Sequence, residues 1–89
     1  MSASERVDCF SVFSAADPSA LPRVLEVFCL YGLVPSRCHS ACTEGDQLVV
    51  DLQVDGLAEG QAARLAKRLE RIVTVTSVLW SEKRLAIAA

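Results

Sequence analysis

Apolar side chains recur along this 89-residue chain at intervals that change from segment to segment. Residues 7–14 (VDCFSVFS) alternate and carry aromatic and β-branched side chains, a pattern that predicts a strand. Successive side chains of a strand point to opposite faces. We therefore expect Phe10 and Val12 to face a core and Phe13 to face the other way.

A helix is predicted to begin within residues 18–20 and to end at Gly32. Asp17 and Ser19 are both good N-cap residues. Gly32 tolerates the left-handed conformation that ends many helices, and Pro35 prevents any continuation. The core-facing residues of this helix recur three or four positions apart: Leu21, Val24, Leu25, Phe28 and Tyr31.

Two further segments, 36–43 and 47–54, flank the three-residue loop 44–46, whose central glycine is typical of a β-hairpin. Pairing about that loop sets three pairs opposite one another: Cys42 with Leu48, Ser40 with Val50, and Cys38 with Leu52. Cys38 and Cys42 then continue the apolar face of the second strand. We therefore expect both cysteines to be core residues.

Residues 55–60 predict a turn into a second helix, and residues 72–80 (IVTVTSVLW) predict a last strand. The buried stripe of the second helix has the same helical spacing: Ala62, Leu65, Ala66 and Leu69. We therefore expect a single domain at residues 8–80, preceded by an extension at 1–7 and followed by a tail at 81–89.

The elements thus follow in the order strand, helix, strand, strand, helix, strand. Right-handed crossovers turn this order into two interlocked βαβ units. The predicted fold is α+β, a ferredoxin-like βαββαβ sandwich in which a four-stranded antiparallel sheet carries two helices on one face. This fold hosts many activities, so function must be inferred from a site.

The composition predicts an oligomer. Hydrophobic residues make up 52% of the chain, whereas a chain of this length buries only about 60% of the surface that its unfolded form exposes. Some apolar surface is therefore expected to meet another subunit. Val27 lies at the edge of the first helix's stripe and Leu30 nearly opposite it, so both are candidates for that contact.

The net charge of −2 provides no overall positive field, so we expect neither nucleic acid nor a membrane surface as a partner. One basic cluster lies in the last turns of the second helix, where positive charge complements the helix dipole: Arg64, Lys67, Arg68 and Arg71. A solvated helix face is the favoured interpretation, with a phosphate-binding stripe as the alternative. No signal peptide or bilayer-spanning run is recognisable, which predicts a cytoplasmic protein.

The segment CHSAC (38–42) invites a metal-site interpretation, but its geometry in a strand is unfavourable. Cys38 and Cys42 would lie about 13 Å apart, and His39 would point to the opposite face. A tetrahedral zinc ion needs thiolate ligands at about 2.3 Å. His39, the chain's single histidine, has no recognisable catalytic partner. We therefore expect no enzyme activity, no metal and no cofactor.

Residues 16–36 (ADPSALPRVLEVFCLYGLVPS) resemble the signature of ACT domains, which are small amino-acid-sensing modules. The positions in register with that signature are Pro18, Leu21, Arg23, Val24, Phe28 and Gly32. Residues 65–78 (LAKRLERIVTVTSV) are similar to the closing segment of the same family. The resemblance covers residues 8–80, and within the family it is greatest for the short form of the acetolactate synthase small subunit.

The resemblance implies a non-catalytic regulatory domain that binds an amino acid at a subunit interface, in a homodimer. In ACT domains the loop before the first helix receives the ligand's carboxylate on backbone N–H groups, as the helix dipole favours. Carried over to this chain, the residues lining the pocket are Asp17, Ser19, Ala20, Leu21 and Val34, with Val34 facing it from the neighbouring strand. A large biosynthetic enzyme subunit is a further partner that the resemblance implies.

Two positions depart from the family pattern, and a third affects the charge of the site. Ser19 stands where the loop usually has glycine, and Val34 stands where an asparagine is common. Asp17 adds a negative charge close to an incoming carboxylate. An alternative therefore stays open: a dimerisation or subunit-docking module whose ligand site is degenerate.

Overall fold

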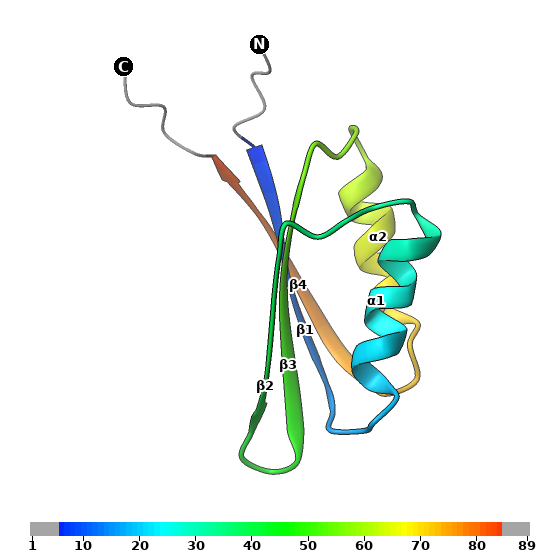
Figure 1. Cartoon of the computed structure of the whole chain (residues 1–89), viewed down its shortest axis with the longest axis vertical. Helices are drawn as coiled ribbons and strands as arrows, with labels where there is room; N and C mark the ends of the chain where they lie inside the picture. The colour runs from blue at the N-terminus through cyan, green and yellow to red at the C-terminus, as the bar shows by residue number, and fades with distance from the viewer. Residues whose placement is uncertain (1–5, 85–89) are drawn as a thin grey trace.

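The computed structural model describes residues 6–84 of the chain. Its elements are, in order, β1 (Arg6–Ala15), α1 (Ala20–Leu30), β2 (Arg37–Thr43), β3 (Gln47–Asp55), α2 (Gln61–Glu70) and β4 (Val75–Arg84). The strands form one antiparallel sheet in the order β2-β3-β1-β4, and both helices lie on the same face of it (Figure 1). The predicted ferredoxin-like α+β fold is confirmed. Neither described helix is long and apolar enough to cross a membrane.

The last strand differs from its predicted limits at both ends. Residues 72–74 form a turn, in which the Val75 N–H donates to the Ile72 carbonyl over 3.0 Å. At the other end, Arg84 still pairs with Arg6, so residues 81–84 belong to β4 although a tail was expected there. Pairing with β1 overrides the polar character of these residues. The remaining parts of the expected extension and tail, 1–5 and 85–89, lie outside the described residues.

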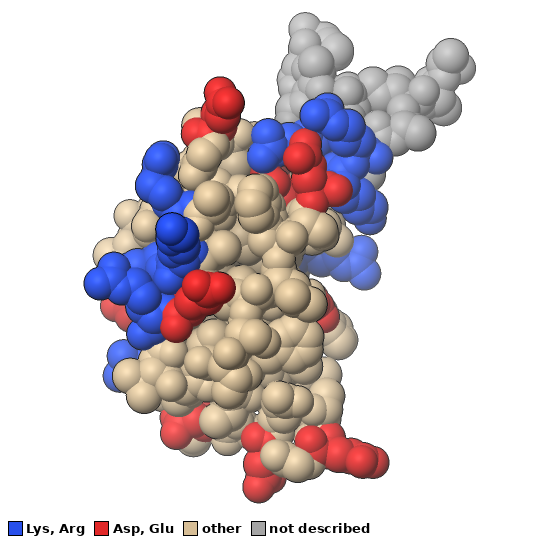
Figure 2. Space-filling model, turned by 180° about the vertical axis from the view of Figure 1, so that it is seen from behind, with Lys and Arg blue, Asp and Glu red and all other residues tan. Residues whose placement is uncertain are grey.

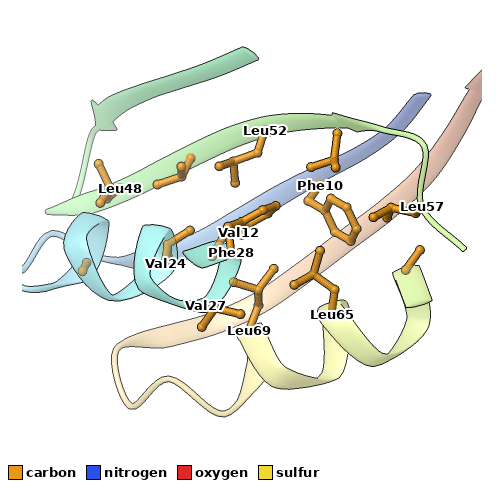
Figure 3. Packing of buried hydrophobic residues seen from close by; sticks show 14 residues of the cluster. Phe10, Val12, Val24, Val27, Phe28, Leu48, Leu52, Leu57, Leu65 and Leu69 are labelled. Atoms are coloured by element: carbon orange, nitrogen blue, oxygen red, sulfur yellow. The ribbon is translucent and has the colours of Figure 1, made fainter. Parts of the chain in front are cut away.

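The core lies between the helices and the covered face of the sheet (Figure 3). Phe10 and Val12 point into it from β1, as predicted, and Phe13 faces the other way. The rings of Phe10 and Phe28 meet edge to face, with centroids 6.0 Å apart and planes at 85°. The buried stripe of α2 is also as predicted, with Ala66 at its half-buried edge.

Helix α1 ends at its predicted glycine. Gly32 has a φ of +69°, its N–H donates to the Cys29 carbonyl, and the Leu33 N–H donates to the Phe28 carbonyl, both over 2.9 Å. These two bonds form a Schellman motif, which satisfies carbonyl groups that the helix end leaves free. The chain therefore leaves the helix sharply and turns back toward β2.

The buried stripe of α1 is rotated from the predicted one. Val27, a candidate for a subunit contact, is only 4% exposed, whereas Leu25, expected in the core, is 39% exposed. Helix α2 packs along the Val27 side of α1, so that flank is covered within the chain. Leu25 lies on the opposite flank, which no helix among residues 6–84 covers.

Strand β2 shows a confirmed register and an incorrect burial prediction. The three predicted cross-strand pairs, including Cys42 with Leu48, are all present. However, every residue of β2 is exposed, so Cys38 and Cys42 are not core residues. The physical reason is position: β2 is an edge strand that lies beyond the cover of the two helices (Figure 1).

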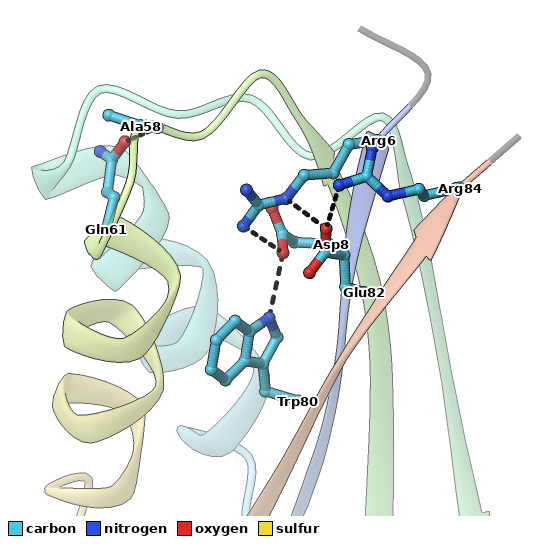
Figure 4. A network of polar contacts seen from close by, with 7 residues as sticks. All are labelled: Arg6, Asp8, Ala58, Gln61, Trp80, Glu82 and Arg84. Atoms are coloured by element: carbon cyan, nitrogen blue, oxygen red, sulfur yellow. Dashed lines mark hydrogen bonds and ion pairs between the residues drawn. The ribbon is translucent and has the colours of Figure 1, made fainter.

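A polar network joins β1 to β4 at the end of the sheet where Arg6 and Arg84 pair (Figure 4). The Asp8 carboxylate is fully buried, and its Oδ1 accepts hydrogen bonds from the Trp80 indole N–H at 3.0 Å and the Arg6 guanidinium at 3.2 Å. Glu82 lies 3.3 Å from Arg6 and 3.2 Å from Arg84. Asp8 is thus a buried charge whose counterion is Arg6.

Candidate ligand site at the head of helix α1

A hollow of about 330 Å³ lies where the loop before α1 meets the turn end of the β2–β3 hairpin. Its lining is mostly apolar and comes from three segments of the chain: Ala16, Asp17, Pro18, Leu21, Cys42 and Leu48. The loop is fixed to the hairpin, because the Ala16 N–H donates to the Asp46 carbonyl over 2.9 Å. A small ligand with an apolar side chain matches this size and lining.

The turn before α1 is held by the carboxylate of Asp17. Its Oδ1 accepts the Ser19 backbone N–H at 2.8 Å and the Ser19 hydroxyl at 2.7 Å. The Ala20 N–H donates to the Asp17 carbonyl over 2.9 Å. Ser19 is the N-cap residue of α1, but its side chain makes no capping bond to the helix. Two backbone donors expected to receive a ligand carboxylate therefore already have acceptors within the chain.

These bonds also hold the pKa of Asp17 below its ordinary value of 3.8. The Ser19 hydroxyl contributes most, followed by the Ser19 backbone N–H, while the charge of Arg23 acts in the same direction more weakly. A carboxyl group with a lowered folded-state pKa stabilises the folded state above its unfolded pKa. That contribution is lost as the pH falls from 3.8 through the lowered folded-state value.

We accordingly predict a small, pH-dependent effect of Asp17→Asn, which keeps an oxygen acceptor for Ser19 and removes only the charge. The variant should be slightly less stable than wild type at neutral pH, and the difference should vanish at pH values well below 3.8. Urea unfolding of both proteins across this range measures the difference. A difference that stays constant at acid pH would show that the Asp17 charge is not its source.

The five residues predicted for the site fall into three groups. Asp17 and Leu21 line the hollow. Ser19 supports the turn beside it, and the side chain of Ala20 is fully buried in the core. Val34 is 84% exposed and lies in the loop beyond the far end of α1, not in a strand as expected. The 11 residues of α1 rise about 16 Å, so Val34 lies away from the hollow of its own chain.

Four residues of the lining were not among the predicted site residues: Ala16 and Pro18 from the loop before α1, and Cys42 and Leu48 from the hairpin. Cys42 and Leu48 form a cross-strand pair at the turn end of the hairpin, next to the loop before α1. Their pairing was predictable, but their position beside that loop depends on how the hairpin and α1 pack on one another. Because Cys42 is exposed on an edge strand, the hollow is open on the side of β2.

The fold recurs in solved structures of low sequence identity. The C-terminal domain of the MgtC protein from Mycobacterium tuberculosis has a TM-score of 0.74 at 15% identity, covering 100% of this chain and 99% of that chain. The ACT domain from the GTP pyrophosphokinase of Chlorobium tepidum has a TM-score of 0.73 at 8% identity, covering 84% and 96%. An uncharacterized protein from Thermotoga maritima has a TM-score of 0.64 at 12% identity, covering 91% and 98%.

A family model for the ACT-like domain matches residues 2–86, which is nearly the whole chain. No curated protein sequence matches the chain significantly. The chain belongs to the ACT-like domain family. ACT domains are generally regulatory ligand-binding modules and are typically non-catalytic.

Proposed function

We propose that this domain binds a hydrophobic amino acid in the hollow at the head of α1 and regulates a biosynthetic enzyme. The observation that carries the proposal is the mostly apolar hollow of about 330 Å³, which lies at the loop used by the family and is left open beside β2. The ligand's side chain would contact Leu21 and Leu48. Its α-ammonium group would lie near Asp17, the only charged residue of the lining.

We further propose that a second copy of the chain closes the hollow. Both faces of β2 are exposed, and its outer edge has no neighbouring strand among residues 6–84. Such an edge is a ready template for pairing with another chain. Leu25, 39% exposed, adds apolar surface on the same flank of α1 as Leu21. A homodimer would cover these groups and separate the ligand from water.

A thermal-shift screen of the purified chain against branched-chain, aromatic and small amino acids tests the proposal. A ligand at 100 times its Kd stabilises the folded state by about 2.7 kcal/mol, which raises the Tm of so small a domain by roughly 10–20 °C. Leu21→Ala should remove the shift, measured from the variant's own Tm. Leu30→Ala is the matched control, because Leu30 lies on the same helix but outside the hollow. A flat screen contradicts amino-acid binding.

A second candidate is a dimerisation or subunit-docking module without a ligand. It is favoured by one observation: the Ser19 and Ala20 N–H groups already donate to Asp17. A flat thermal screen together with a dimer by light scattering would support this candidate and leave sensing unsupported. A monomer that binds nothing would contradict both candidates.

The particular role that we propose is the regulatory small subunit of acetolactate synthase, in the cytoplasm. Its support is the resemblance of residues 16–36 and the free thiols of the four cysteines, which are typical of a reducing compartment. Adding the chain to a purified large subunit of that enzyme should change its activity. An unchanged activity, with no complex formed, would contradict this role but not amino-acid binding itself.

A further inference from the structure

A second cavity lies on the other flank of α1, where this helix faces the C-terminal end of α2. Its volume is about 180 Å³, and Val27 and Ile72 contribute apolar surface to it. Three arginines line it, Arg23, Arg68 and Arg71. Figure 2 shows the corresponding accumulation of basic side chains over the helices. The basic cluster noted in the sequence is therefore partly gathered around a concave site.

These three arginines have no ion-pair partner within 4.0 Å among residues 6–84. The ion pairs of the described chain all belong to the network around Arg6 at the far end of the sheet. Glu26 also lines the cavity, but its carboxylate lies beyond ion-pair distance of the guanidinium groups. The lining thus carries three positive charges and one negative charge.

Helix stability does not account for this arrangement. Arg68 lies in the last turn of α2, where positive charge is favourable, but Arg23 lies near the N-terminus of α1, where it opposes the helix dipole. No acidic residue occupies the first turn of α1 to offset it. The charge of Arg23 helps to lower the pKa of Asp17, but the two side chains form no ion pair among residues 6–84. The arginines of the two helices instead gather positive charge around one cavity.

We propose that this cavity binds a small polyanion, either a phosphate compound or a polycarboxylate, as a second ligand of the domain. Planar guanidinium groups match phosphate and carboxylate oxygens and form strong charge-assisted hydrogen bonds with them. The cavity is smaller than the roughly 300–1,000 Å³ of sites for drug-sized ligands, so a small anion fits and a whole nucleotide does not. No aromatic side chain lines it to stack a base. The site is independent of the hollow beside β2.

NMR titration of the full chain with inorganic phosphate, pyrophosphate and citrate, at constant ionic strength, tests this inference. We expect saturable shifts of the Leu30, Ile72 and Val73 signals, with a Kd below about 1 mM for at least one anion. Arg68→Gln with Arg71→Gln should weaken binding at least about tenfold. Arg64→Gln with Lys67→Gln is the matched control, because it removes two charges of α2 that do not line the cavity.

The outcomes separate the possible ligands from a general charge effect. Stronger binding of pyrophosphate assigns a phosphate compound, and stronger binding of citrate assigns a polycarboxylate. Arg23→Gln provides a second variant, acting from the other helix, should the double variant of α2 unfold. Anion binding that is weakened equally in both double variants would overturn the inference. The absence of saturable changes in the NMR signals on titration would also overturn it. Leu21→Ala should leave anion binding unchanged, so failure of this site and failure of the amino-acid site are distinguishable.

Discussion

Phe28→Ala is expected to lower the free energy of unfolding by about 3–5 kcal/mol. Phe28 is 1% exposed at the centre of the core, and its ring packs edge to face against Phe10. Truncation removes buried apolar surface, leaves a cavity between α1 and the sheet, and removes the aromatic contact. Because small domains have total stabilities of about 5–15 kcal/mol, this loss should bring the protein close to unfolding. Urea denaturation followed by circular dichroism measures it.

Leu30→Ala is the internal control for this experiment. Leu30 lies two residues further along the same helix but is 63% exposed, so its truncation should change stability by no more than about 0.5 kcal/mol. Similar losses for the two variants would mean that the core is not centred where the structure places it. If the domain dimerises through α1, the comparison at two protein concentrations separates folding from association.

The sequence was sufficient to predict the element order and the strand register. The hairpin loop and the alternation on either side of it identify the pairing of Cys42 with Leu48, which the structure contains. The same alternation was insufficient to predict burial. It establishes that Cys38 and Cys42 share a face with apolar neighbours, but whether anything covers that face depends on where the helices pack. The packing of the helices is a feature of the tertiary structure, which a local sequence pattern does not predict.

The burial of residues in helix α1 was also not fully predictable from the sequence. The spacing of apolar residues in α1 fits a core-facing stripe bordered by Leu25 as well as one bordered by Val27, because these two residues lie at opposite edges of the stripe. The packing of α2 decides between them by covering Val27 and leaving Leu25 39% exposed. Both errors concern surface on the same side of the molecule, toward β2.

In the candidate site, too, the local residues were predictable and the residues brought close by the fold were not. The contribution of the loop, Asp17 and Leu21, was predictable because it is local to the head of the helix. The contribution of the hairpin was not, because its residues approach only through the fold. The hydrogen bonds from Ser19 to Asp17 could not be read from the sequence either, since they depend on the orientation of one carboxylate. They nonetheless decide which donors remain for a ligand.

Arg6→Ala is expected to destabilise the domain by about 3 kcal/mol, because it leaves the Asp8 carboxylate buried without a counterion. Asp8 is 0% exposed, and its Oδ2 has no hydrogen-bond partner among the described residues. After the substitution, the Trp80 indole N–H would be the one donor among the described residues that still reaches this carboxylate. Replacing Asp8 by asparagine in the Arg6→Ala background removes the buried charge. The double variant should therefore recover most of the lost stability.

Arg84→Ala is the matched control at the same end of the sheet. The Arg84 side chain is 76% exposed and, among residues 6–84, pairs only with Glu82, so its loss should cost less than about 1 kcal/mol. Urea unfolding of the single variants and the double variant yields the coupling energy between Arg6 and Asp8. A double variant as unstable as Arg6→Ala would mean that packing of the arginine stem, and not the charge of Asp8, causes the loss. Recovery by Asp8→Asn would instead identify Arg6 as the counterion that allows a carboxylate to be buried between β1 and β4.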